Sequence, residues 1–181
     1  YGADAVYLGG KAFGLRAFAA NFSLEEIREM AAFAHARGKK VYVTVNIYPH
    51  NSDLTALPEY LRNLEEAGVD ALLVSDLGVW VTARKTVPKL GLHVSTQANV
   101  TNWAAAKAWE ELGAERVVLA RELSIQEIRE IREKISADLE VFVHGAMCIS
   151  YSGRCLLSNY FTGRDSNRGA CAQVCRWEFG L

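Results

Sequence analysis

Short apolar runs rich in β-branched residues alternate along the chain with longer stretches in which apolar residues recur every three or four positions. The short runs predict strands of a parallel sheet, because such strands are buried on both faces. The longer stretches predict amphipathic helices. The predicted strands are Ala5–Leu8, Val41–Ile47, Ala71–Val74, Leu92–Ser95, Val117–Ala120 and Leu139–Val143.

Capping signals mark the ends of the predicted helices. Two Ser-x-x-Glu motifs, which start at Ser23 and Ser124, have the spacing of a capping box, in which two side chains satisfy backbone amides at a helix start. Gly38, Gly68 and Gly113 stand where a left-handed residue would end a helix. The predicted helices are Asn21–Arg37, Leu54–Ala67, Gly78–Lys85, Trp103–Leu112 and Ser124–Ile135.

A repeated segment supports a regular α/β fold. Segments that begin at Gly2, Gly68 and Gly113 share a glycine, an apolar residue, an acid and then a mainly apolar strand. Six strands about 25 residues apart and joined by helices indicate a (β/α) barrel or a doubly wound sheet. The GxGxxG fingerprint of dinucleotide-binding sheets is absent from the sequence. We therefore predict an incomplete (β/α)8 TIM-like barrel at residues 1–147, followed by a truncated cysteine-rich loop at 148–181.

Composition narrows the function classes only slightly. The 181 residues carry a formal net charge of −1, so the domain as a whole is not a general polyanion binder, although a local basic patch stays open. No apolar run approaches the roughly 20 residues that a membrane-spanning helix needs. We expect a cytoplasmic protein.

All four cysteines, Cys148, Cys155, Cys171 and Cys175, lie near the end of the chain. Buried free thiols and disulfides are alternatives, but clustering argues against the first and the large core against the second. Thiolates select zinc and iron–sulfur clusters, so we favour a metal centre. The pairs lack the CxxC spacing of structural zinc sites, which favours iron–sulfur and leaves zinc as the alternative.

Polar residues follow several predicted strands, at the end of a barrel where active sites lie. Ser95, Gln97 and Asn99 belong to a run of small and amide residues that could line a pocket or cap the next helix. Arg121 could clamp a carboxylate or phosphate, or pair with a neighbouring glutamate. His144 stands four residues before the first cysteine, where it either approaches the metal centre or serves as a hydrogen-bonded structural residue.

The cysteine-rich loop is locally basic. Arg154, Arg164 and Arg168 are interleaved with aromatic residues, a combination that suits phosphate contact and base stacking in single-stranded RNA. The alternative is that these arginines offset the negative charge of a thiolate–metal centre.

The sequence resembles the collagenase-like peptidase family U32. The resemblance rests on Tyr1-Gly-Ala-Asp-Ala-Val-Tyr-Leu-Gly-Gly10, on Phe142-Val-His-Gly-Ala-Met-Cys-Ile-Ser-Tyr-Ser-Gly-Arg-Cys-Leu-Leu-Ser158 and on Asn167-Arg-Gly-Ala-Cys-Ala-Gln-Val-Cys-Arg176. Members of this family are described as peptidases, or as proteins of oxygen-independent hydroxylation that act on tRNA uridine or rRNA cytidine with prephenate implicated. Others act in ubiquinone synthesis.

The resemblance implies a [4Fe-4S] cluster held by Cys148, Cys155 and Cys171, with Cys175 or a later cysteine as fourth ligand. It implies hydroxylation of RNA, with a small organic acid in the barrel mouth and arginines of the loop near the RNA. A collagenase-like peptidase and an iron–sulfur scaffold without enzymatic activity stay open as alternatives. The resemblance also implies that the chain continues beyond both ends, and an unfinished barrel would expose sheet edges that favour self-association.

Overall fold

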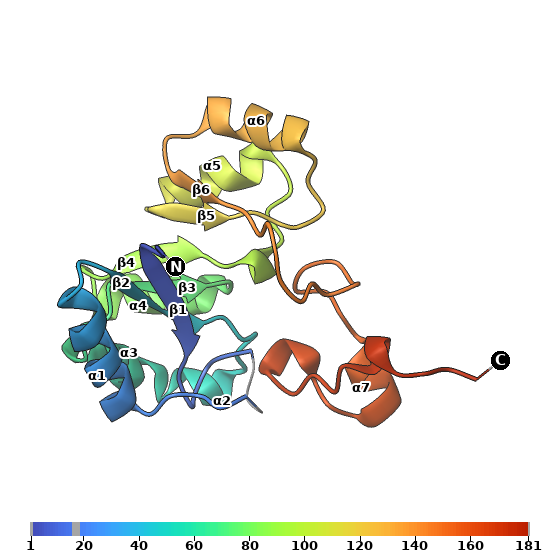
Figure 1. Cartoon of the computed structure of the whole chain (residues 1–181), viewed down its shortest axis with the longest axis horizontal. Coiled ribbons are helices and arrows are strands. Elements are labelled where there is room, and N and C mark those ends of the chain that lie inside the picture. The colour runs from blue at the N-terminus through green and yellow to red at the C-terminus, as the bar shows by residue number, and fades with distance from the viewer. Residues whose placement is uncertain (1, 16–18, 181) are drawn as a thin grey trace.

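The computed structural model describes residues 2–15 and 19–180. Tyr1 and Leu181, where the sequence predicts truncation, lie outside the described residues. Six parallel strands form one sheet, and each pairs with the next along the chain. The strands are β1 (Ala5–Gly9), β2 (Lys40–Val45), β3 (Ala71–Val74), β4 (Gly91–Val94), β5 (Arg116–Val118) and β6 (Asp138–Glu140). A doubly wound sheet would reverse its strand order, so this curled sheet is an α/β half-barrel, as predicted (Figure 1).

Helices connect consecutive strands and cover the outer face of the sheet (Figure 1). Capping boxes at Ser23 and Ser124 are confirmed at the starts of α1 and α6, respectively. Positive φ angles of 66°, 83° and 87° at Gly38, Gly68 and Gly113 confirm the left-handed residues that follow three helices. The helices of this part are α1 (Leu24–His35), α2 (Asn51–Leu54), α3 (Leu57–Glu66), α4 (Leu77–Thr86), α5 (Trp103–Glu111) and α6 (Ile125–Lys134).

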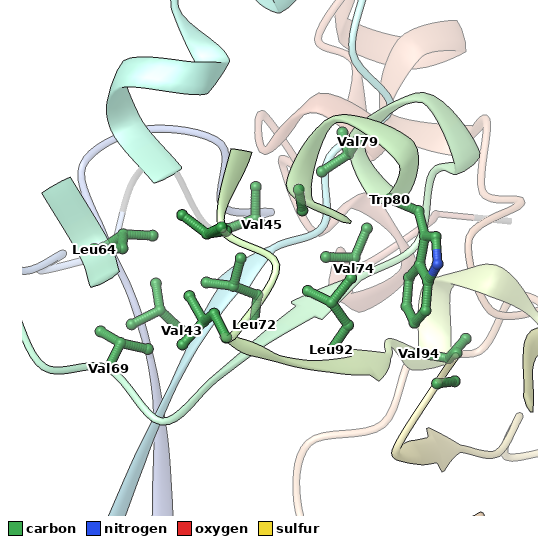
Figure 2. Close-up of a cluster of buried hydrophobic side chains, with 14 of the residues drawn as sticks. Val43, Val45, Leu64, Val69, Leu72, Val74, Val79, Trp80, Leu92 and Val94 are labelled. Atoms are coloured by element: carbon green, nitrogen blue, oxygen red, sulfur yellow. The ribbon is translucent and has the colours of Figure 1, made fainter. Parts of the chain in front are cut away.

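Alternate residues of each strand face two different environments. Side chains such as Val43, Leu72 and Leu92 point outward and pack with Trp80 of α4 in the main core between sheet and helices (Figure 2). The intervening residues face the barrel interior, where Tyr42, Ala71, Leu73 and Val118 form a second, smaller cluster. The side-chain period of two therefore buries both faces of the central strands.

One predicted helix is wrong in its extent. The stretch Leu54–Ala67 is not continuous, because α2 ends at Leu54 and α3 begins at Leu57. Pro58 lies in the first turn of α3, where its missing backbone N–H costs nothing. In a helix that continued from α2, Pro58 would have no N–H to donate to the carbonyl four residues earlier, so proline favours a new helix start over a continued helix.

The segment after β6 leaves the sheet and folds beside the barrel (Figure 1). We call residues 148–180 the cysteine lobe. It contains a helix that the sequence did not predict, α7 (Leu157–Thr162), and two 3₁₀ turns, η2 (Ser166–Arg168) and η3 (Val174–Arg176). Strands β1 and β6 form the two edges of the sheet, and within the described residues they do not pair with each other. None of the described helices is long and apolar enough to cross a membrane.

Candidate functional site at the barrel mouth

A polar network lies where the central strands end. Asn46 follows β2, and its Nδ2 donates to Ser95 Oγ at 3.1 Å, beyond the end of β4. Ser75, after β3, donates from its hydroxyl to the Asn46 carbonyl oxygen at 2.9 Å. All three side chains are buried, so their mutual hydrogen bonds replace lost water contacts. The network ties together the carboxyl ends of three strands.

Asn46 and Ser95 of this network line a cavity of about 540 Å³. It opens along the inner face of the half-barrel, and its volume falls in the range of small-molecule sites, roughly 300–1,000 Å³. Its polar lining includes Thr44, Ser95, Gln97, Arg121, Glu140, His144 and Cys148. Cationic, anionic and thiol groups therefore meet in one cavity.

Four of the five residues predicted to bind substrate line this cavity: Ser95, Gln97, Arg121 and His144. Asn99 lies one turn further along, with a left-handed φ of 54°, and does not belong to the cavity lining that the structure describes. The convergence follows from topology, because parallel strands all end at the same edge of the sheet.

Two aromatic groups near the site, the buried His93 and the half-buried Tyr48, stay uncharged at neutral pH. Burial, with help from the nearby positive charge of Arg116, lowers the pKa of His93, which faces the barrel interior on β4, to about 4. The His93 ring packs edge-on against Tyr42, with ring centroids 4.7 Å apart. Burial raises the pKa of Tyr48, so its hydroxyl remains a donor and gives a 2.8 Å hydrogen bond to the Gln97 carbonyl oxygen.

The three predicted RNA-binding arginines differ in their surroundings. Arg168 forms a two-pronged ion pair with Asp53, at 2.7 and 3.3 Å, and donates to the Tyr48 carbonyl oxygen at 3.0 Å. Arg164 donates to the carbonyl oxygens of Ala170 and Cys171 within the cysteine lobe. Arg154 is exposed, and its guanidinium makes no hydrogen bond to any of the described residues. Arg168 therefore holds the lobe against the barrel, and Arg154 faces solvent.

The four thiols have the donor chemistry of a soft-metal or iron–sulfur site. All four are free, with Cys155 half-buried and the other three exposed. Among the described residues, no three His, Cys, Asp or Glu side chains lie close enough together to hold a metal ion. The donor set therefore fits such a centre, whereas the placement of the thiols in this structure does not gather them around one point.

Two features of the site escaped prediction from the sequence. Ser152, between the first two cysteines, is buried and binds Arg121 through its hydroxyl. Asp53, which immediately precedes the second predicted helix, anchors Arg168. The Ser-Gly pair at 152–153 indicates a turn, but no local pattern shows which distant side chain such a turn will meet.

Comparison with known proteins places the chain among relatives of similar sequence. The model of peptidase family U32 matches residues 1–181. The chain is 51% identical to tRNA hydroxylation protein P1 of Bacillus subtilis, covering 100% of this chain and 43% of the relative. It is 42% identical to a 23S rRNA 5-hydroxycytidine synthase of Escherichia coli, covering 100% of this chain and 27% of that protein. The chain thus spans less than half the length of these relatives.

A solved structure supports the fold independently. The U32 peptidase Mk0906 superposes with a TM-score of 0.64 at 22% identity, covering 77% of this chain and 60% of that chain. At this identity the likeness concerns the arrangement of the strands and helices.

Proposed function

The chain belongs to peptidase family U32, and on that premise we propose that it is part of a protein that hydroxylates RNA. The observation that carries the proposal is its similarity, over its whole length, to proteins named for tRNA hydroxylation and for synthesis of 5-hydroxycytidine in rRNA. The site adds a cavity with an arginine at the mouth of a half-barrel. RNA substrates of this kind would place the protein in the cytoplasm.

The cavity would hold the small organic acid, such as prephenate. Arg121 supplies a permanent positive charge at the mouth, and a guanidinium binds carboxylates through two parallel hydrogen bonds. Ser95 and Gln97 add neutral polar groups from the loop after β4, and His144 adds an imidazole from the segment after β6. Asn99 would act indirectly, through the turn that carries Gln97.

The cysteine lobe would hold a [4Fe-4S] cluster, with zinc as the alternative metal. Cys148, Cys155 and Cys171 would be ligands, and Cys175 or a cysteine elsewhere in the whole protein would complete the set. Such a cluster supplies electron transfer. Because Cys148 also lines the cavity, this residue would bring the metal centre close to the bound acid.

RNA would approach over the exposed side of the lobe. The guanidinium of Arg154 is exposed and makes no hydrogen bond to any of the described residues. Tyr151, Tyr160 and Trp177 are exposed aromatic side chains of the same lobe. Exposed aromatics beside arginines suit stacking of unpaired bases. Arg164 and Arg168 would contribute charge while they hold the lobe in shape.

Mass spectrometry of RNA nucleosides tests the function. Deletion of the gene for the intact protein should remove a hydroxylated pyrimidine from tRNA or rRNA, and the wild-type gene should restore it. Unchanged nucleosides would refute RNA hydroxylation. Cleavage of gelatin by the homogeneous protein would then favour the peptidase, and an iron-loaded protein with neither activity would favour a scaffold.

Anaerobic purification of the intact protein tests the metal. Iron and sulfide in stoichiometric amounts, with a visible absorption band that Cys155→Ala abolishes, are the expected result. Stoichiometric zinc without iron would overturn the iron–sulfur assignment. Comparison of Cys171→Ala with Cys175→Ala decides whether both of the later cysteines are ligands.

A further inference from the structure

Ser152 joins the cysteine lobe to the cavity arginine. Its side chain is completely buried. The Arg121 guanidinium donates to the Ser152 hydroxyl oxygen through both Nε, at 3.2 Å, and Nη2, at 3.0 Å. Both donors lie on one edge of the planar fork, so this pair of bonds defines the orientation of the guanidinium plane.

Glu122 holds Ser152 from its other side. The Ser152 backbone N–H donates to Glu122 Oε1 at 3.1 Å, and the hydroxyl donates to Oε2 at 3.5 Å. The hydroxyl therefore accepts from the arginine and donates to the glutamate. Within the described residues Arg121 and Glu122 form no direct ion pair, although they are neighbours in the chain. Ser152 stands between two opposite charges that would otherwise meet.

The backbone around Ser152 is held firmly in place. The turn Tyr151–Arg154 is closed by a hydrogen bond from the Arg154 N–H to the Tyr151 carbonyl oxygen, at 3.1 Å. Gly153 has a φ of 71°, and a Cβ atom at this position would overlap the Gln97 carbonyl oxygen. The turn that carries Ser152 thus packs directly on the loop after β4.

We propose that Ser152 is a positioning residue that keeps Arg121 available for the carboxylate of the bound acid. The inference rests on the proposed function of the cavity. The Nε–Nη2 edge of Arg121 is occupied by Ser152, whereas Nη1 has no partner among the described residues. The Nη1–Nη2 end of the guanidinium therefore remains for the two parallel hydrogen bonds of the ligand carboxylate. Without the Ser152 hydroxyl, the Glu122 carboxylate forms a two-pronged ion pair with the Arg121 guanidinium and competes with the ligand, because such arginine–carboxylate pairs are strong.

Titration calorimetry of the intact protein with prephenate tests the proposal. Ser152→Ala should weaken binding at least tenfold, and the double variant Ser152→Ala with Glu122→Gln should recover most of that loss, because the competing charge is gone. Ser158→Ala is the matched control. Ser158 is a buried serine of the same lobe, 1% exposed, and among the described residues its hydroxyl accepts only from the Ala172 N–H, at 2.9 Å. Its loss should change affinity less than twofold.

A second measurement needs no ligand. The Arg121 Nε–H should exchange slowly with solvent in the wild type and at least tenfold faster in Ser152→Ala, as followed by ¹⁵N NMR. Prephenate binding by Ser152→Ala equal to wild type, or an equal loss in Ser158→Ala, would overturn the positioning role and leave the proposed function standing. Failure of the wild-type protein to bind prephenate would overturn the proposed role of the cavity as the site of this acid, and the positioning role with it.

Discussion

The ion pair between Arg168 and Asp53 should hold the cysteine lobe on the barrel. Arg168 lies on η2 and Asp53 on α2, 115 positions apart in the chain. Next to this pair, the Tyr48 N–H donates to the Asn167 carbonyl oxygen at 3.0 Å, so one backbone amide crosses the same contact. Removal of the pair should therefore loosen the lobe before the barrel unfolds.

The strength of the pair follows from its geometry and exposure. Charge-assisted hydrogen bonds contribute about 1.5–3 kcal/mol, whereas fully exposed ion pairs contribute roughly 0–1 kcal/mol. The two side chains are 27% and 23% exposed, between these limits. We expect a coupling free energy of about 1–2 kcal/mol, which changes an opening equilibrium by a factor of roughly 5–30.

A double-mutant cycle isolates this coupling. Arg168→Met also loses the bond to the Tyr48 carbonyl oxygen, and Asp53→Ala also loses the 2.6 Å bond that its carboxylate accepts from the His50 N–H. Each of these side losses occurs in a single variant and again in the double variant, so it cancels from the coupling free energy.

Amide hydrogen exchange measures the coupling free energy between Arg168 and Asp53. The Tyr48 amide reports on the contact, and the Ala170 amide, which donates within the lobe to the Asp165 carbonyl oxygen at 2.9 Å, is the internal control. Each single variant should lower protection at Tyr48 at least fivefold more than at Ala170. A coupling below about 0.3 kcal/mol, within the usual error of additivity, would refute the reasoning.

The same amide should show the pH dependence of the pair. The Arg168 hydrogen bonds, with help from the His50 backbone, lower the pKa of Asp53 below its ordinary value. A carboxyl group with a lowered pKa stabilises the folded form above its unfolded pKa of about 3.9 and loses this contribution as the pH falls below it. Protection at Tyr48, corrected for intrinsic exchange, should thus decline below about pH 4 in the wild type but not in Asp53→Ala.

Three further predictions concern stability. In urea denaturation, Gly153→Ala should lower the free energy of unfolding by about 2 kcal/mol more than Gly163→Ala. Both glycines have positive φ, but only at Gly153 would an added Cβ overlap a neighbouring atom. Equal losses in the two variants would contradict this reasoning. Trp80→Ala should lower the free energy of unfolding by about 3–5 kcal/mol, since the Trp80 side chain is 1% exposed. Val81→Ala, at a residue that is 46% exposed, should lower it by less than about 0.5 kcal/mol. Similar losses in the two variants would contradict the described core. The wild type should lose stability as the pH falls from about 6.5 towards 4, because His93 binds a proton in the unfolded chain but stays neutral when it is buried in the folded one. An NMR resonance of His93 in the folded protein that titrates near pH 6.5 would contradict this prediction.

The secondary structure was predicted well because its signals are local. A capping box, a glycine after a helix and a run of β-branched residues each act within a few positions, so they can be identified without knowing the fold. The helix expected at Leu54–Ala67 was wrong at its start, since a new helix begins at Leu57, with Pro58 in its first turn, despite the continuous apolar periodicity. The residues of α7 are partly exposed, and their pattern contains no apolar stripe that would have signalled a helix.

The candidate site was predicted in part, and topology explains which part. Ser95, Gln97 and Arg121 follow strands, and parallel strands must end together, so their meeting could be inferred once the strands were assigned. The pairing of Arg168 with Asp53 and of Arg121 with Ser152 could not be inferred in this way. These contacts join a loop to the barrel across many residues, and no periodicity or spacing encodes them.

By itself the sequence determined the alternation of strands and helices, the half-barrel, the family and the cluster of thiols. Each of these depends on local patterns of burial or on a distinctive motif. Only the tertiary structure decided that a thiol lines the cavity and that a serine separates Arg121 from Glu122. The physical reason is that a hydrogen bond between distant residues depends on where the backbone carries both partners, and that position results from the packing of the whole chain.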